Sequence, residues 1–243
     1  MKTVIIKTSI LLLLLLTIVS CKKQNSVTPS KKLSYQFKVV TASVPLSASI
    51  NNSRLQILST ATGGGEVTWQ SGYANVSSIS FDGQNQNNNN EEDDFNEPQV
   101  YKVDLFSSNQ LLGNIDVAPG TYHNVEIKVE LKRTLTDSAL FLKGIYTTAS
   151  GSIPVELSLD GNDNNLLEIP VTAQDLTVGS TNSYIAIINL HLDKLMAGVT
   201  STDLDSATLI NGSILINSSS NIAIYTKIKA NIDNFSDDNY NNE

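Results

Sequence analysis

Residue types that build reactive centres are scarce in this sequence. Its 243 residues include one cysteine, two histidines and one tryptophan, and only 16% of them are charged. One cysteine cannot form an intramolecular disulfide or a cysteine-rich metal site, and two histidines exclude a three-histidine zinc site. The sequence therefore predicts no cofactor.

Basic residues are outnumbered by acidic ones. Sixteen lysines and arginines stand against 24 aspartates and glutamates, which gives a formal charge of 16 − 24 = −8. Such a chain lacks the positive surface that binds phosphate backbones, so no nucleic-acid partner is expected. The apolar fraction of 40% is sufficient for a folded core, and the length suits one all-β domain.

Residues 1–20 are predicted to be a signal peptide. Lys2 and Lys7 lie just before an apolar run over residues 9–19 that contains six consecutive leucines. This run is too short for a transmembrane helix, which needs about 20 apolar residues, but it has the length of a secretory signal.

The segment Ile18-Val19-Ser20-Cys21 resembles the lipobox of bacterial lipoproteins. The resemblance implies cleavage before Cys21 and attachment of acyl chains such as palmitate to that residue, which would anchor the protein in a membrane. The alternative is a plain signal peptide with an incidental cysteine, which would leave an unpaired thiol in an oxidising compartment. Cleavage removes two lysines and no acids, so the mature chain has a charge of 14 − 24 = −10.

Lysine rather than aspartate follows the cysteine, at positions 22 and 23. Resemblance to Gram-negative lipoproteins then implies delivery to the outer membrane. The sequence leaves open whether the protein faces the periplasm or the cell surface. Residues 21–32, which are polar and include Pro29, are expected to form a lipidated flexible tether.

Alternation of apolar and polar residues dominates from Leu33 onward. The clearest example is the segment 122–132, in which Val125, Ile127 and Val129 alternate with charged residues. This period is typical of a strand with one buried and one solvated face. Similar segments separated by glycine- and asparagine-containing turns predict a mainly β fold, a single antiparallel β-sandwich domain over residues 33–232.

Short helices are expected only near the C-terminus, over residues 192–196 before Gly198 and over residues 202–205. Residues 222–232 fit one helical face, although strand alternation also fits them, and we favour the helix. Two acidic segments without apolar periodicity, an insert loop at 82–99 and a tail at 233–243, are predicted to be disordered.

Two polar runs resemble cation-binding loops. Residues 91–94 are all acidic, and Asp160, Asn162 and Asn164 have the alternating spacing of calcium ligands within residues 160–165. The second run lacks the glycine and the acid at the twelfth position that such a loop requires. We interpret both runs as solvated turns rather than calcium sites.

Candidate catalytic residues do not form a recognisable set. His123 and His191 lie in phase with apolar residues of predicted strands and are expected to be structural. No serine has the setting of a nucleophile elbow, and no glycine-rich loop precedes a phosphate-binding lysine. A carboxylate pair for glycoside hydrolysis stays open, although no pair stands out. The protein is predicted not to be an enzyme.

Two tripeptides, Asp137-Ser138-Ala139 and Asp205-Ser206-Ala207, resemble the sequon at which Bacteroidota attach O-glycans to exported proteins. The resemblance implies that Ser138 and Ser206 are candidate glycosylation sites.

Several motifs together resemble a family of Bacteroidota lipoproteins that contain a β-sandwich domain of unknown function. They include residues 69–73 (Trp-Gln-Ser-Gly-Tyr), residues 117–122 with a Pro-Gly-Thr-Tyr turn, and residues 188–195. The resemblance implies the host, the anchor and a β-rich fold, and it implies no activity. Pro119-Gly120 by itself suits a type II turn.

These observations favour a non-catalytic, lipid-anchored binding module whose loops contact a glycan or an envelope protein. A structural or assembly component of the cell envelope or of a surface filament is the second hypothesis. The third is a hydrolase that uses acidic residues.

Overall fold

The computed structural model describes residues 31–48, 64–86, 92–97, 101–107, 111–160, 166–172, 175–179 and 184–242. The predicted signal peptide, Cys21 and most of the predicted tether lie outside these residues.

The larger of two sheets is organised around one long strand, β3 (Glu66–Asn85). On one edge of β3, first β8 and then β7 pair with it. On its other edge it pairs successively with β2, β5 and β4. These partners are β8 (Leu140–Thr148), β7 (Gly120–Lys132), β2 (Ser43–Pro45), β5 (Tyr101–Asp104) and β4 (Glu92–Glu97).

The larger sheet extends beyond these strands in both directions. Past β8 the order continues β9-β14-β13, and past β7 it continues to β10, with β11 also paired to β7. The bounds of these outer strands are β9 (Gly151–Leu159), β10 (Leu166–Thr172), β11 (Leu176–Val178), β13 (Leu209–Ile210) and β14 (Ser213–Ile216).

The smaller sheet has the order β15-β12-β1-β6. Its strands are β1 (Lys31–Val40), β6 (Leu111–Val117), β12 (Tyr184–His191) and β15 (Ser236–Asn242). The pair β1–β12 is parallel, which the long connection between these strands permits, and β14–β9 in the larger sheet is parallel too. The prediction of a mainly β fold is confirmed, and both sheets are mixed rather than purely antiparallel.

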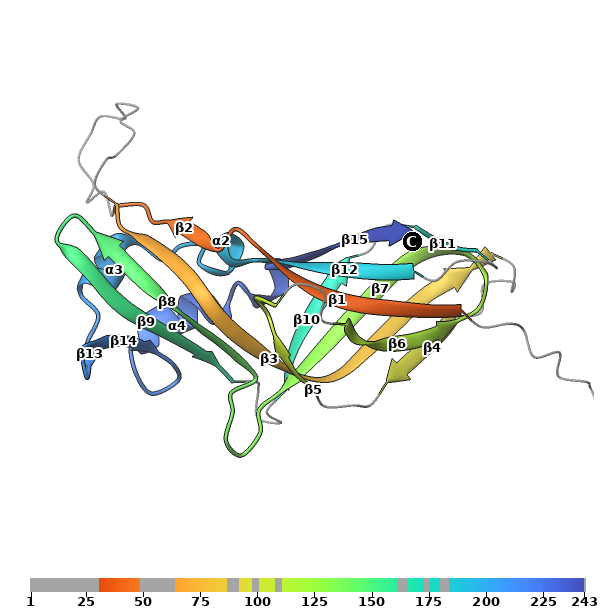
Figure 1. The fold of residues 1–243 in the computed structure, drawn as a ribbon, viewed down its shortest axis with the longest axis horizontal. Coiled ribbons are helices and arrows are strands. Elements are labelled where there is room, and N and C mark those ends of the chain that lie inside the picture. The colour runs from red at the N-terminus through yellow and green to blue at the C-terminus, as the bar shows by residue number, and fades with distance from the viewer. Residues whose placement is uncertain are drawn as a thin grey trace, which may run out of the picture.

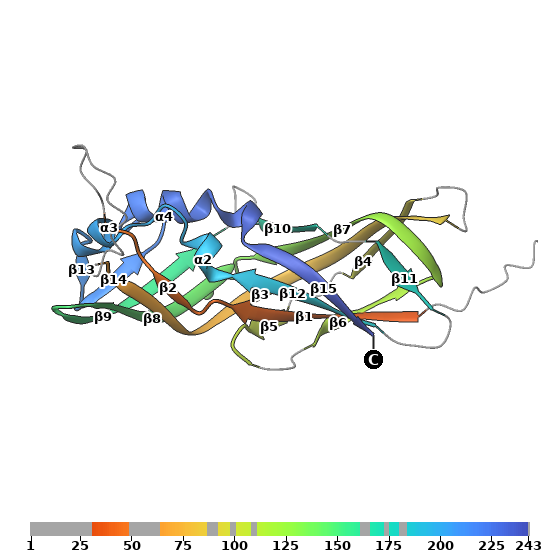
Figure 2. The same cartoon turned by 90° about the horizontal axis from the view of Figure 1, so that it is seen from above.

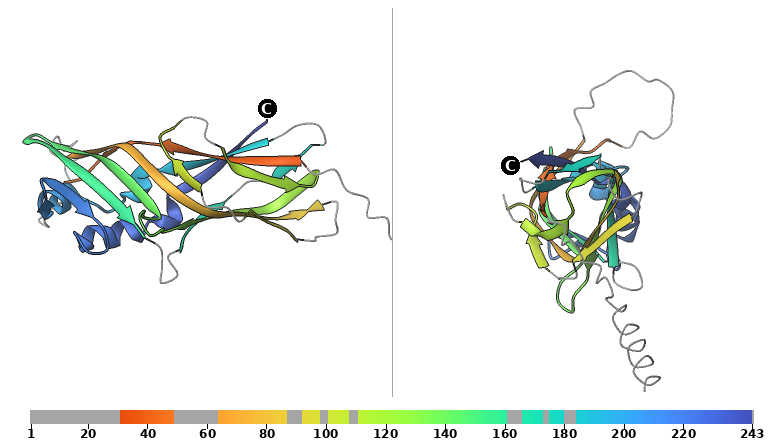
Figure 3. Two further views of the ribbon diagram at one scale, coloured as in Figure 1. Left: turned by 60° about the horizontal axis from the view of Figure 1, so that its bottom comes forward. Right: turned by 90° about the vertical axis from the view of Figure 1, so that its right-hand side faces the viewer.

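The two sheets and the helices enclose one core. The smaller sheet lies over the β7 end of the larger one (Figure 1), whereas α3 (Ser201–Asp205) and α4 (Ile222–Lys229) cover the end formed by β9 and β14 (Figure 2). Seen along the long axis, the strands close around this interior (Figure 3). The buried side chains form a single cluster that includes Phe37, Trp69, Ile127, Leu157, Ile188 and Ile228.

The alternation that predicted strands corresponds to burial. In β7, Val125, Ile127 and Val129 are buried, while Glu126 and Lys132 are exposed. Removing apolar surface from water stabilises the fold by about 25 cal/mol for each Å², and this gain drives the apolar faces together.

The helices occur where the sequence predicted them. α2 (Leu192–Leu195) is followed by a turn in which Gly198 has φ +76°, a conformation that glycine adopts without steric cost. The choice of helix over strand for the segment that begins at 222 is confirmed by α4, which is followed by the short 3-10 helix η3 (Ile232–Asn234). α4 buries Ile224, Tyr225 and Ile228.

The described parts of both segments predicted to be disordered include strands. The C-terminal tail forms β15, which pairs with residues 184–190 of β12, directly after the fully buried Phe235. In the insert, β3 continues to Asn85 and β4 pairs with residues 79–84 of β3. Backbone pairing to an open sheet edge needs no apolar side chains, and composition therefore does not reveal it.

The Pro119-Gly120 segment also differs from its prediction. A type II turn would place the glycine at positive φ, but Gly120 is not among the described glycines with positive φ. It begins β7 instead, where an added Cβ would lie 2.5 Å from Asn85 Oδ1. The glycine is therefore needed for close strand packing. Tyr122 is fully buried, and its hydroxyl donates to the carbonyl oxygen of Ala118 at 2.9 Å.

Candidate functional site

Two aromatic side chains stack on the outer face of the larger sheet. The register between β3 and β8 places Tyr73 directly opposite Phe141. Their ring centroids are 5.3 Å apart with an interplanar angle of 24°. Both rings are partly exposed, whereas their neighbours Ala74, Leu140 and Leu142 are buried in the core. We call Tyr73 and Phe141 the aromatic platform.

A lysine and an aspartate hold the tyrosine of this platform. Lys102 Nζ, from β5, lies 3.9 Å from the centroid of the Tyr73 ring and 2.8 Å from Asp137 Oδ1. A cation above an aromatic ring is attracted by the negative potential of the ring face. The carboxylate of Asp137 also lies close enough to the Tyr73 phenol to raise the pKa of that phenol.

The protonation states of these groups are well defined. The hydrogen bond from Lys102 lowers the pKa of Asp137, and the same bond raises the pKa of Lys102. Burial, together with the adjacent Asp137, raises the pKa of the Tyr73 phenol. At neutral pH, Asp137 is therefore a carboxylate, Lys102 an ammonium ion and Tyr73 a neutral hydrogen-bond donor.

The loop that supplies Asp137 is ordered by its own hydrogen bonds. It connects β7 to β8 and projects from the body of the molecule (Figure 1). Thr134 N donates to the carbonyl oxygen of Asp137 at 2.9 Å, and Asp137 N donates to Thr134 Oγ1 at 3.0 Å. At one end of the loop, Arg133 Nη1 lies 3.2 Å from Asp160 Oδ2. Asp137 is thus presented to Lys102 by a preformed turn.

The platform borders a hollow of about 420 Å³. Its lining combines the two rings with polar side chains and the backbone of Gly72: Ser71, Gly72, Tyr73, Lys102, Asp104 and Phe141. An added Cβ on Gly72 would lie 2.5 Å from the carbonyl oxygen of Phe141. The close approach of β3 and β8 at this point therefore requires glycine. We call this hollow the platform hollow.

The predicted structural histidines have structural contacts. Gln86 donates its side-chain N–H to His123 Nε2, which leaves the proton on Nδ1, and Nδ1 lies 2.7 Å from Asp175 Oδ2. His123 is thus held at both nitrogens and does not lie beside the platform hollow. His191 Nδ1 is 3.9 Å from Asp193 Oδ1, which is beyond hydrogen-bond distance.

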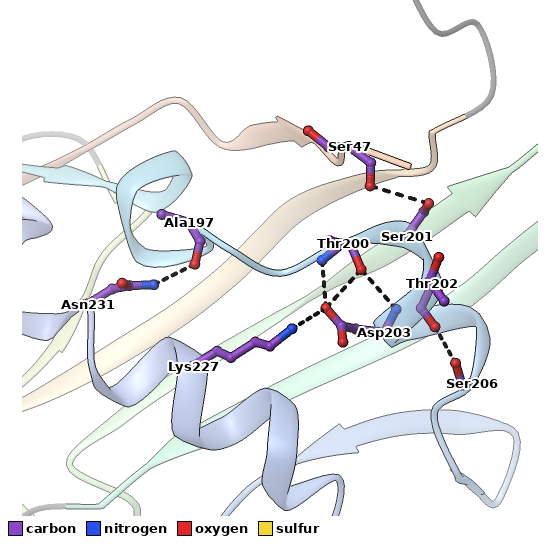
Figure 4. Close-up of polar contacts among 9 residues, drawn as sticks. All are labelled: Ser47, Ala197, Thr200, Ser201, Thr202, Asp203, Ser206, Lys227 and Asn231. Carbon is purple, nitrogen blue, oxygen red and sulfur yellow. Dashed lines mark hydrogen bonds and ion pairs between the residues drawn. The ribbon is translucent and has the colours of Figure 1, made fainter. Parts of the chain in front are cut away.

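The two predicted glycosylation serines lie on different elements of the fold. Ser138 follows Asp137 in the projecting loop, and its carbonyl oxygen accepts a 2.9 Å bond from Asn75 Nδ2. Ser206 is exposed at the end of α3, where its hydroxyl donates to the carbonyl oxygen of Thr202 (Figure 4). Glycosylation of either serine stays a prediction.

The polar network around α3 is structural. Asp203 Oδ2 accepts from Thr200 N, Thr200 Oγ1 and Lys227 Nζ at 2.8, 2.9 and 2.7 Å (Figure 4). Burial opposes ionisation of Asp203, but the bonds from Lys227 and Thr200 outweigh it and lower the pKa. The network caps α3 and ties it to α4.

Several predicted site residues fall outside the described residues. These are Cys21, residue 91 of the acidic run and residues 161–165 of the second calcium-like run. Among the residues that the structure does describe, no cluster of three or more His, Cys, Asp or Glu side chains could hold a metal ion. Within the same part of the chain, the helices are all too short or too polar to cross a membrane.

Comparison of the chain with family models, curated proteins and solved structures finds no match. The resemblance to Bacteroidota lipoproteins therefore stays a prediction from sequence motifs.

The sequence placed the two side chains of the aromatic platform in predicted strands but did not identify them as a site. Tyr73 belongs to the motif at 69–73, and Phe141 and Lys102 lie in segments with strand alternation. Each of these side chains is followed along its strand by a buried side chain, and this alternation shows that it points outward. Only the pairing register brings them together, and no local pattern specifies it.

Proposed function

We propose that the protein is an outer-membrane lipoprotein that binds a glycan at the aromatic platform without catalysing a reaction. The single observation that supports the binding role is the stacked Tyr73–Phe141 pair beside a hollow lined with polar groups.

The chemistry of the platform hollow suits a sugar ring. A pyranose has an apolar face of C–H groups, which packs on aromatic rings, and a rim of hydroxyls, which needs donors and acceptors. The hollow offers the partly exposed rings of Tyr73 and Phe141 next to Ser71, Asp104 and Lys102. A mostly apolar hollow with a few convergent polar groups is the usual form of a small-ligand site.

The environment of Asp137 favours binding over hydrolysis. A general acid for glycoside hydrolysis needs a raised pKa, so that it is protonated near neutral pH. Asp137 has a lowered pKa because Lys102 donates to it at 2.8 Å. Its oxygens are thus engaged in positioning the platform.

Membrane attachment is proposed from the sequence at Cys21. The lipobox-like segment ends at this residue, and the first described strand begins at Lys31, ten residues further on. Acylation at Cys21 would place the sheets close to the membrane surface through a short tether. We leave the face of the outer membrane open.

A glycan array followed by calorimetric titration tests the binding role. We expect Phe141→Ala to weaken binding of any array hit by about tenfold, because an aromatic contact contributes about 0.5–1.5 kcal/mol beyond the area that it buries. The matched control is Ile145→Ala, which removes another partly exposed side chain from the same strand but does not line the hollow.

Equal affinities for the Phe141→Ala variant and the wild type would place the ligand elsewhere. If no glycan binds and crosslinking in cells gives a ladder of oligomers, a structural role in the envelope replaces the proposal.

A further inference from the structure

A second hollow of about 410 Å³ lies next to the platform hollow. Its walls come from β1, from the bend between β1 and β2, from the turn after β5 and from β12. Its lining includes Gln36, Lys38, Ala42, Phe106, Ser107 and Ile187. We call it the β1 hollow.

The two hollows share one wall. Asp104 lines the platform hollow, and the next three residues, 105–107, line the β1 hollow. The wall is fixed, because Leu105 N donates to the carbonyl oxygen of Gly72 at 3.0 Å and Phe106 N donates to Asp104 Oδ1 at 2.9 Å.

The opposite wall of the β1 hollow is also attached to β3. Thr41, with φ +60°, turns the chain from the smaller sheet toward β2, and the carbonyl oxygen of Ala42 accepts a 2.9 Å bond from Trp69 N. The two walls are therefore anchored only three residues apart on β3, at Trp69 and Gly72. Because Gly72 also lines the platform hollow, the hollows adjoin at this point.

The lining of the β1 hollow repeats the character of the platform hollow. Apolar surface from Phe106 and Ile187 lies beside the polar side chains of Gln36, Lys38 and Ser107. Lys38 is exposed. Apolar patches next to hydrogen-bonding groups recur on both sides of the turn, and this is the pattern that successive sugar units of one chain require.

We propose that the protein binds a linear oligosaccharide at two subsites, with one part of the chain in the platform hollow, another part in the β1 hollow and the intervening units passing over residues 104–107. This inference rests on the proposed glycan binding and specifies its ligand class. A chain held in one hollow raises the effective concentration of its remaining units at the other, so affinity increases once the chain is long enough to reach both hollows.

The test uses the purified full-length protein and graded di-, tetra- and hexasaccharide fragments of glucans, mannans and galactans, titrated by calorimetry. For the class that binds, we expect the hexasaccharide to bind at least tenfold more tightly than the disaccharide. The double variant Gln36→Ala/Lys38→Ala should abolish this gain, so that it binds the hexasaccharide no more tightly than the disaccharide. The control Lys128→Ala removes a lysine from β7, which lines neither hollow, and should behave like the wild type.

The outcomes separate this inference from the function on which it rests. Affinity that is independent of chain length, or a length gain that survives in the double variant, overturns the second subsite while glycan binding stands. If the length gain is present but Phe141→Ala has no effect, the platform is not part of the site and both proposals fail. Absence of binding to every fragment removes both as well.

Discussion

Replacing Asp203 distinguishes helix capping from ion pairing in the network that joins α3 to α4. In Asp203→Asn, the amide oxygen can still accept from Thr200 N, but the ion pair with Lys227 is lost. In Asp203→Ala, the helix cap and the ion pair are both lost, and the backbone N–H of Thr200 loses its 2.8 Å acceptor. The two variants therefore differ mainly in the cap.

The contacts give the expected magnitudes. Lys227 and Asp203 have side chains that are 42% and 24% exposed, so their ion pair is screened by solvent and contributes about 0.5 kcal/mol. Loss of a reciprocal cap costs about 1 kcal/mol. We expect the free energy of unfolding to fall by about 0.5 kcal/mol in Asp203→Asn and by about 1.5 kcal/mol in Asp203→Ala.

Urea denaturation measures these differences. The chain has one tryptophan, and Trp69 is only 2% exposed, so its fluorescence reports unfolding of the core around which both sheets pack. Lys227→Met on each background completes a double-mutant cycle, in which we expect a coupling of about 0.5 kcal/mol with Asp203. Equal destabilisation by Asn and Ala would refute the reasoning, because the charge and not the cap would then dominate.

The same network predicts a pH dependence with a defined sign. The pKa of Asp203 is lower in the folded than in the unfolded chain. Its contribution to the free energy of unfolding is therefore fully present above the unfolded pKa near 3.8. It is lost as the pH falls through the folded value. At pH values below about 4, we expect the urea concentration at the unfolding midpoint to decrease in the wild type and to decrease less in Asp203→Asn. Parallel slopes for the two proteins would contradict this assignment.

Three further predictions concern the anchor, the core and the platform. Cys21→Ser should shift the protein from the membrane to the soluble fraction of cell extracts, and continued membrane association would disprove lipidation at that residue. Tyr146→Phe should lower the free energy of unfolding by about 1 kcal/mol, because the buried hydroxyl donates to Asp205 Oδ1 at 2.9 Å; an unchanged urea midpoint would show that this bond adds nothing. Gly72→Ala should reduce glycan affinity more than Ser71→Ala does, because its Cβ would displace Phe141 and separate the stacked rings; equal effects in calorimetry would show that the platform tolerates the shift.

The sequence determined the features that depend on local periodicity and local stereochemistry. Alternation in 122–132 predicted β7, Gly198 marked the turn after α2, and the helical face at 222–232 predicted α4. These succeed because each residue's burial is repeated at a fixed interval along its own element. The lipobox-like segment at Cys21 is also a local motif, and lipidation at that residue stays a prediction.

Only the tertiary structure decided the features that depend on backbone pairing between distant segments. The acidic tail forms β15 because β12 offers an open edge, and backbone hydrogen bonds are indifferent to side-chain composition. Gly120 allows close packing against Asn85 and does not form the predicted turn. No neighbouring residue in the sequence indicates this role. Tyr73, Lys102 and Phe141 come from three strands, and only the register of β5 and β8 along β3 brings them together. The sequence alone predicted which side chains are buried, whereas strand pairing, which depends on distant segments, assembled the site.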